Sequence, residues 1–357
     1  VVRDVLISAF QSAGQRCSAL RVLFLQADTA DRVIELIKGA MDELKLGSPQ
    51  ELATDVGPLI DEPARQRLHE HCQRLDKEAR LLHVAKSAPT HSQGYFFAPR
   101  LYEIQHMKQL PEEVFGPIVH VIRYAADELS AVVDQINAAG FGLTLGIHTR
   151  IQRRADYLAA AVKVGNVYVN RDMVGAVVGV QPFGGRGLSG TGPKAGGPLY
   201  VRNLRRHDSG ADRQRYKAAD TAPAALSSPA GERNLYLIQP RGVVAAFYAA
   251  GDPVSHCLAT MDAVLSTGNA LHLVIPDGWR DVVLEREHVL RSELGELGAV
   301  VLHDPVQLGA AACYHTLVIP PGSALLQATM SRLLDQQCGA LPRIVRDEPS
   351  ASYWQRF

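Results

Sequence analysis

Residues 21–44 read RVLFLQADTADRVIELIKGAMDEL, a short apolar run at Arg21–Leu25 followed by an amphipathic stretch at Asp31–Leu44. The run of large and β-branched apolar residues is typical of a buried strand, and the stretch repeats its apolar residues at helical spacing. The same alternation recurs at Ile118–Tyr124 (IVHVIRY), Ala126–Ala139 and Asn166–Asn170 (NVYVN). Strands that alternate with helices predict an α/β fold built on a mostly parallel sheet.

A second series of strand and helix patterns lies in the C-terminal third of the chain. We expect strands at Val243–Ala249, Ala270–Ile275, Ala299–His303 and His315–Ile319, separated by helices at Pro253–Ser266, Trp279–Leu294 and Leu325–Gln337. Residues 208–232 are polar, rich in Ala, Pro and Ser, and lack apolar periodicity, which is typical of a linker. We therefore predict a first domain at 1–207, a linker at 208–232 and a second α/β domain at 233–357.

The composition excludes several classes of protein. Lys plus Arg and Asp plus Glu both number 37, so the net charge is zero and no excess of basic residues favours nucleic acid or a membrane surface. No apolar run reaches the roughly 18–20 residues of a membrane-spanning helix. The five cysteines are odd in number and scattered, so we expect free thiols in a reducing compartment, the cytoplasm.

The segment Phe10–Ala19 (FQSAGQRCSA) carries the strongest local signal for chemistry. An isolated cysteine is most often a small buried apolar residue. Here Gly14 permits close approach of the backbone, and Arg16 can place positive charge near the thiol, which favours the reactive thiolate. We predict that Cys17 is a catalytic nucleophile.

Gly14–Cys17 (GQRC) resembles the active-site motif of the aldehyde dehydrogenase superfamily, and Glu112–Pro117 (EEVFGP) resembles its cofactor-proximal motif. Four more segments follow the family's order: Asp55–Pro58 (DVGP), Phe141–Leu143 (FGL), Gly165–Asn170 (GNVYVN) and Pro182–Gly185 (PFGG). Residues 8–21, 170–185 and 187–198 resemble, more narrowly, the bacterial proline utilization A family. Its members combine proline dehydrogenase with L-glutamate γ-semialdehyde dehydrogenase, and residues 230–347 resemble the C-terminal domain of its longer members.

The resemblance implies an aldehyde dehydrogenase catalytic domain, three-layered around a mostly parallel sheet, followed by a Rossmann-like α/β domain that is truncated. It also implies a fragment, because the family's nucleotide-binding half, its general base and its oxyanion-hole asparagine lie upstream of the cysteine motif. The FAD-dependent proline dehydrogenase domain is expected to be missing as well. We expect this fragment alone to be inactive, and the full-length protein to be a cytoplasmic homo-oligomer, with peripheral membrane association left open.

The resemblance also implies roles for individual residues. Cys17 would attack the aldehyde carbon of L-glutamate γ-semialdehyde, and the hydride would pass to NAD. Glu113 would accept hydrogen bonds from the nicotinamide ribose, beside Phe115. The remaining expected site residues are substrate-binding: Arg16, Ser18, Phe183, Ser189, Gly190 and Thr191.

Two alternatives stay open. The first is a broad-specificity or acylating aldehyde dehydrogenase, and the second is a non-catalytic interaction or assembly module in the C-terminal part. We expect no metal site, because His69 and His71 in the tract His69–Cys72 (HEHC) would point to different faces of a helix. The cysteines other than Cys17 are expected to be packing residues: Cys72, Cys257, Cys313 and Cys338.

Overall fold

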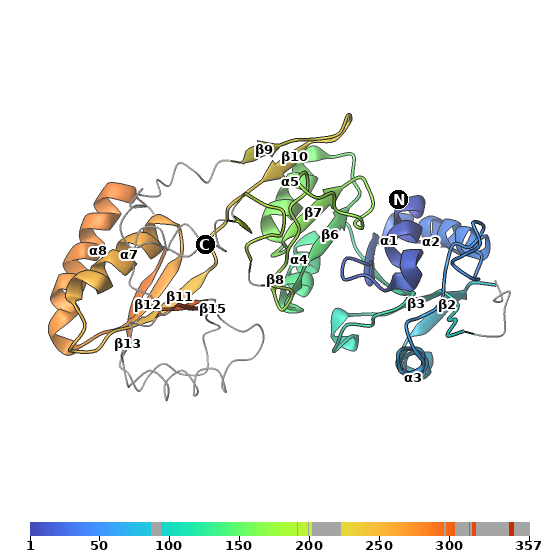
Figure 1. Cartoon of the computed structure of the whole chain (residues 1–357), viewed down its shortest axis with the longest axis horizontal. Coiled ribbons are helices and arrows are strands. Elements are labelled where there is room, and N and C mark those ends of the chain that lie inside the picture. Colours follow the sequence, from blue (N-terminus) through green and yellow to red (C-terminus); the bar gives the residue numbers. More distant parts are fainter. Residues whose placement is uncertain are drawn as a thin grey trace. The chain divides into compact units, whose positions relative to one another are not determined.

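The computed structural model describes residues 1–86, 94–190, 192–198, 200–201, 223–295, 298–303, 314, 316–318 and 343–345. The chain forms two compact units, Val1–Ala176 and Val177–Phe357, which are described separately (Figure 1). Several predictions fall outside the described residues: the helix at 325–337, most of the linker, Thr191, Cys313 and Cys338.

The division between the units lies between Ala176 and Val177, ahead of the linker expected from composition. Residues 177–201 belong to the second unit, where the Gln181 amide bonds to Glu232 and the Arg186 guanidinium bonds to Gln239. The end of the expected linker is also structured. The strand β9 (Ala224–Leu226) pairs antiparallel with β10 (Asn234–Tyr236).

The first unit contains a four-stranded sheet in the order β1-β4-β3-β2 and a smaller parallel pair, β6-β7. In the larger sheet β1, β4 and β3 are parallel, and the edge strand β2 is antiparallel to β3. The strands are β1 (Val22–Gln26), β2 (Arg80–Val84), β3 (Arg100–Glu103), β4 (Ile118–Tyr124), β5 (Phe141–Gly142), β6 (Thr144–Ile147) and β7 (Asn166–Val169). The helices are α1 (Val2–Phe10), α2 (Ala27–Asp42), α3 (Glu62–Glu78), α4 (Leu129–Ala138) and α5 (Gln152–Ala161), with 3-10 turns η1 (Gln11–Gly14) and η2 (Met107–Gln109).

Helices cover both sides of the larger sheet, as expected for a three-layer α/β fold. In the view of Figure 1, α1 and α2 lie above β2 and β3, and α3 lies below them. The buried residues of α2 are Ala30, Ile34, Ile37 and Met41, one stripe at helical spacing. The first five residues of β4 are buried because the strand lies between layers.

The predicted elements of the first unit agree with the structure except at their ends. The strand at Ile118–Tyr124 is confirmed residue for residue. Helix α2 begins at Ala27 rather than at Asp31. Its first turn already contributes a fully buried residue, Ala30, to the core. No expected element corresponds to β2 or β3, and β2 is an edge strand that begins with two exposed residues.

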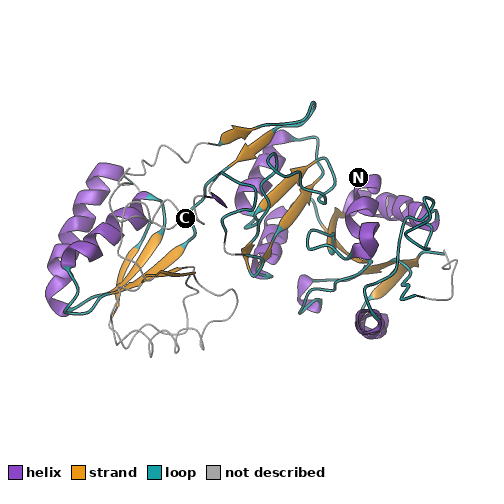
Figure 2. Cartoon of the chain, viewed as in Figure 1, coloured by secondary structure: helices purple, strands orange, loops and turns teal. Residues whose placement is uncertain are grey.

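The second unit contains a parallel five-stranded sheet in the order β13-β12-β11-β14-β15. Numbered along this sheet, the order is 3-2-1-4-5, which is that of the Rossmann fold and confirms the expected Rossmann-like domain. Its strands are β11 (Val243–Phe247), β12 (Ala270–Val274), β13 (Val300–His303), β14 (Thr316–Val318) and β15 (Arg343–Val345), and a short strand β8 (Arg186–Gly187) precedes them in the chain. Its helices are α7 (Val254–Ser266) and α8 (Arg280–Leu294), with a 3-10 turn η4 (Asp277–Trp279). Figure 2 shows both helices beside this sheet.

Two of the cysteines expected to be packing residues are buried, Cys72 in α3 and Cys257 in α7. Burial raises the pKa of the Cys257 thiol to about 12, and it also raises the pKa of the Cys72 thiol. Both thiols are therefore protonated at neutral pH. None of the described helices is long and apolar enough to cross a membrane.

Candidate active site

The Cys17 thiol is exposed at the end of a sharp reversal that follows α1. Three consecutive residues, Ser12, Ala13 and Gly14, have positive φ angles of 54°, 53° and 65°. Such angles are uncommon in residues other than glycine, and the strain they store often marks a functional segment. A turn closed by the Ala19 N–H and the Arg16 carbonyl (3.0 Å) then presents Cys17. Within the described part of the chain, the Cys17 backbone N–H donates no hydrogen bond, so it is available to a ligand oxygen.

Glycine is required at position 14 because this loop meets the loop before β4. A Cβ atom built on Gly14 would collide with the carbonyl oxygen of Gly116 and would lie 2.6 Å from its carbonyl carbon. It would also lie 2.8 Å from the carbonyl oxygen of Ala9. The cysteine motif and the Glu112–Pro117 motif, far apart in sequence, are therefore in direct backbone contact.

Gln15 connects the cysteine loop to a third motif, Asp55–Pro58. Its side-chain amide donates to the carbonyl of Pro58 (3.2 Å), and its side-chain oxygen accepts from the backbone N–H of Ile60 (2.8 Å). The same amide donates to the carbonyl of Ser12 (3.1 Å). One glutamine therefore satisfies three backbone groups and fixes the loop that carries Cys17.

The two neighbours of Cys17 lie in different surroundings. The Arg16 guanidinium donates to the Ser12 hydroxyl (3.1 Å), and no charge pair with Cys17 accompanies it among the described contacts. Ser18 is only 6% exposed. Arg21, which no motif in the sequence singled out, donates to the backbone carbonyls of Gly14 (2.7 Å) and Arg16 (3.1 Å), just before Cys17. The substrate-binding roles of Arg16 and Ser18 stay predictions.

Glu113 and Phe115 are both accessible, with the Glu113 side chain 41% exposed and Phe115 44% exposed. Glu113 Oε1 faces the guanidinium of Arg21 at 3.4 Å, and Oε2 accepts no hydrogen bond from the described residues. A carboxylate oxygen of this kind can accept from a vicinal diol such as a ribose. The accessible Phe115 ring can pack beside a planar base, so the two residues fit the nicotinamide end of NAD.

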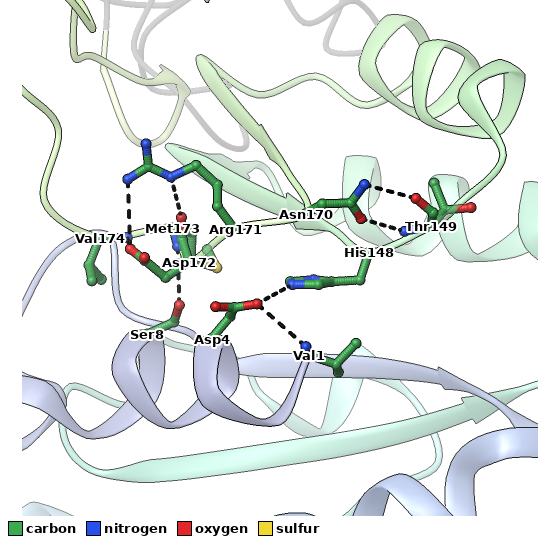
Figure 3. Close-up of polar contacts among 10 residues, drawn as sticks. All are labelled: Val1, Asp4, Ser8, His148, Thr149, Asn170, Arg171, Asp172, Met173 and Val174. Carbon is green, nitrogen blue, oxygen red and sulfur yellow. Dashed lines mark hydrogen bonds and ion pairs between the residues drawn. The ribbon is translucent and has the colours of Figure 1, made fainter. Parts of the chain in front are cut away.

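Helix α1, which leads to the cysteine loop, is held at its other turns by the segments after β6 and β7. Figure 3 shows His148 bonded to Asp4 (2.8 Å), and the backbone N–H of Met173 donating to the Ser8 hydroxyl (3.1 Å). Asn170, with φ at 57°, exchanges two hydrogen bonds with the backbone of Thr149 (Figure 3). Asn170 thus fixes the segment that follows β6 against the end of β7.

A chain of hydrogen bonds runs from α3 to the backbone of Arg21. His120 Nδ1 lies 2.9 Å from the Arg21 carbonyl, and its Nε2 lies 2.9 Å from His71 Nε2. Because a carbonyl only accepts, His120 carries its proton on Nδ1 and accepts from His71 through Nε2. Desolvation lowers the pKa of both histidines, to about 4 for His71. His69 instead contacts the ring of Phe97, so the HEHC tract does not converge on one point.

The expected substrate loop belongs to the second unit and is closed by its own backbone. Phe183 and Ala195 exchange backbone hydrogen bonds of 2.9 and 3.0 Å. The backbone N–H of Ser189 donates to the Arg186 carbonyl (3.0 Å), and that of Gly190 lies 3.5 Å from the Gly187 carbonyl. The backbone N–H groups of Ser189 and Gly190 are therefore engaged in turn contacts. Thr191 lies outside the described residues.

Comparisons with known proteins agree with the motifs. The model of the aldehyde dehydrogenase family matches residues 1–207. Bifunctional protein PutA of Klebsiella aerogenes is 41% identical over 360 residues, covering 98% of this chain and 26% of that protein. The 1-pyrroline-5-carboxylate dehydrogenase of Geobacillus sp. (strain WCH70) is 33% identical over 201 residues, covering 56% of this chain and 38% of that protein.

A solved structure of proline utilization A from Bradyrhizobium japonicum is 56% identical and superposes with a TM-score of 0.53, covering 56% of this chain and 20% of that one. The chain thus spans about a quarter of the length of the Klebsiella protein. The names of these relatives agree with the resemblance that the sequence motifs indicated.

Proposed function

Because the chain belongs to the aldehyde dehydrogenase family, we propose that it forms the cysteine-bearing part of a longer NAD-dependent dehydrogenase. Its reaction is the oxidation of L-glutamate γ-semialdehyde to L-glutamate, the second step of proline catabolism. The observation that carries the proposal is the strained, exposed Cys17 loop in contact with the Glu112–Pro117 motif. The names of the similar PutA and 1-pyrroline-5-carboxylate dehydrogenase proteins favour this substrate over other aldehydes.

In the proposed reaction the Cys17 thiolate adds to the aldehyde carbon and forms a C–S bond, while the carbonyl oxygen becomes an alkoxide. The Cys17 backbone N–H, which has no partner among the described residues, can donate to that oxygen. Loss of hydride from the same carbon leaves a thioester on Cys17. Water then replaces sulfur, which releases the carboxylic acid and restores the thiol.

NAD supplies the hydride acceptor when it is bound. We propose that Glu113 holds the ribose hydroxyls through its available Oε2, and that Phe115 packs beside the nicotinamide. The exposure of both side chains supports this assignment, as does the contact between their loop and the cysteine loop.

For the polar end of the substrate, the resemblance implies a further set of residues. We propose that the Ser189 hydroxyl and the backbone at Gly190 and Thr191 bind the amino-acid end, with Phe183 along the aliphatic middle. Arg16 and Ser18 would bind from the cysteine side.

The test is steady-state kinetics of the full-length protein with L-glutamate γ-semialdehyde and with a short aliphatic aldehyde. Ser189→Ala should lower kcat/KM for the semialdehyde about ten- to a hundred-fold, since a hydrogen bond to a charged group contributes roughly 1.5–3 kcal/mol. The aliphatic aldehyde lacks that group and should lose little. Equal losses would refute the assignment of Ser189, and absence of NAD-dependent oxidation of either aldehyde would refute the proposed function.

We propose a separate role for the domain built on the Rossmann-like sheet of the second unit: it is a non-catalytic module. The turn between β11 and α7, residues 248–253 (YAAGDP), contains a single glycine, whereas dinucleotide-binding turns are glycine-rich. A Cβ atom built on Gly251 would have no atom of a residue beyond its chain neighbours within 4 Å, so a larger side chain fits there. Gly251→Val should therefore leave the KM for NAD unchanged, and a several-fold rise would contradict the non-catalytic role.

A further inference from the structure

Arg21 lies between the cysteine loop and the cofactor-proximal loop, just before β1. Its side chain is 15% exposed, so the charge is largely withdrawn from water. Burial lowers its pKa, opposed by attraction to Glu113 and to Cys17. Arginine stays charged in this setting, and a buried cation needs partners for its donors.

Two of these partners belong to the cysteine loop. Nη1 donates to the carbonyl of Gly14 (2.7 Å), and Nη2 donates to the carbonyl of Arg16 (3.1 Å). The two carbonyls lie on either side of Gln15, immediately before Cys17. The guanidinium therefore fixes the backbone that places the thiol.

The remaining partners belong to the cofactor-proximal loop. Nη1 also donates to the carbonyl of Gly116 (3.1 Å), and both Nε and Nη2 lie 3.4 Å from Glu113 Oε1. The guanidinium carbon lies 4.8 Å from the centroid of the Phe115 ring, within the range of a cation–π contact. All five N–H donors of Arg21 are thus engaged, two by the first loop and three by the second.

From this geometry we propose that Arg21 is a positioning residue that sets the separation between the thiol of Cys17 and the cofactor held by Glu113 and Phe115. The inference rests on the proposed function, which assigns NAD to those two side chains. Glu113 is directed by its Oε1 contact with Arg21, while its Oε2 stays available to the ribose. Phe115 is held on one face by the guanidinium, which leaves the ring accessible to a ligand.

Lysine cannot replace Arg21, because an ammonium has three donors and no planar fork, so at least two of the five contacts are lost. Loosening Glu113 and Phe115 should weaken the productive binding of NAD more than that of the aldehyde, which meets Cys17 directly. A role in folding alone would lower the amount of active enzyme and leave both KM values unchanged.

The experiment compares wild type, Arg21→Lys and Arg21→Gln in the full-length protein, with Arg123→Lys as the matched control. Arg123 is a half-buried arginine of the same sheet, paired with Glu103 and Asp31, and none of its described contacts reaches either loop. KM is measured for NAD and for the semialdehyde, and active enzyme is counted by titration of Cys17 with iodoacetamide. The Gln variant carries no buried charge, so it remains informative where the Lys variant does not fold.

We expect Arg21→Lys to raise the KM for NAD at least ten-fold and Arg21→Gln to raise it further. The KM for the aldehyde should change less than three-fold, and Arg123→Lys should match wild type. Variants of Arg21 with a wild-type KM for NAD, and with kcat reduced only in proportion to active enzyme, would overturn the positioning role. A wild-type protein without NAD-dependent activity would instead overturn the proposed function on which the inference rests.

Discussion

The contact between Gly14 and Gly116 predicts a large effect of a single methyl group. Gly14→Ala places a Cβ at φ 65°, in the left-handed region that costs a non-glycine residue about 1 kcal/mol or more. The same Cβ would lie 2.6 Å from the carbonyl carbon of Gly116 and 2.8 Å from the carbonyl oxygen of Ala9. Both are backbone atoms that cannot rotate away, and overpacking of this kind costs about 1–3 kcal/mol. We expect a total loss of about 2–5 kcal/mol.

The matched control is Gly39→Ala. Gly39 lies inside α2, and nothing lies within 4 Å of a Cβ built there. Alanine favours a helix interior over glycine by about 0.5–1 kcal/mol, so this variant should be as stable as wild type or more stable. The two substitutions add the same methyl group, so only its surroundings differ.

The first assay is urea unfolding of both variants in the full-length protein, monitored by circular dichroism. The second assay is the rate at which iodoacetamide alkylates Cys17. Gly14→Ala should shift the unfolding midpoint strongly downward and change the alkylation rate, because the reversal that presents the thiol has moved. Gly39→Ala should do neither. A Gly14→Ala protein within about 0.5 kcal/mol of wild type would refute the inferred contact between the two loops.

Three further predictions concern stability. His120 is buried and neutral, and its pKa is lowered. The free energy of unfolding should therefore fall by up to about 1.4 kcal/mol per pH unit as the pH drops below the unfolded pKa of about 6.5. His120→Gln should flatten that pH profile in urea titrations. Asp61 caps α3 by accepting from the Ala64 N–H (2.7 Å), so Asp61→Ala should cost about 1 kcal/mol in the same titration, whereas an unchanged midpoint would argue against the cap. Gln15→Leu removes the side-chain partner of the Ile60 N–H and of the Pro58 carbonyl, while the Ser12 carbonyl keeps the Gln15 backbone N–H. A loss of about 1 kcal/mol is expected, and a neutral result would count against the bridge.

The regular elements were predictable from sequence because their signals are local. Apolar runs located β4 and four of the five strands of the Rossmann-like sheet, and helical spacing located α7 to within one residue. The strand β2 was missed because an edge strand carries less apolar signal than a central one, and β3 was missed because its four residues include only two that are buried. The strand β15, three residues long, offers too short a run to recognise.

The motif predicts Cys17 as the candidate nucleophile, but it does not predict the surroundings of that thiol. Gln15 and Arg21 act through partners far away in sequence, Pro58 for the one and Gly116 for the other. No spacing rule reports such contacts. Positive charge near the thiol was expected from Arg16, its immediate neighbour, and the fold also brings the Arg21 guanidinium to the backbone carbonyls of Gly14 and Arg16. The backbone reversal at Ser12 and Ala13 also carried no signal, since neither residue type favours positive φ.

The central claim, that Cys17 forms the covalent intermediate, is tested most directly by mass spectrometry of the full-length protein. The protein is mixed with L-glutamate γ-semialdehyde and NAD, quenched in acid within milliseconds and digested with trypsin, which releases Cys17 in the peptide 17–21 (CSALR) and Cys72 in the peptide 68–74 (LHEHCQR). We predict an acyl group on the peptide of Cys17, none on that of Cys72, and no adduct in Cys17→Ser. An acyl group on another cysteine, or turnover by Cys17→Ser at the wild-type rate, would contradict the account.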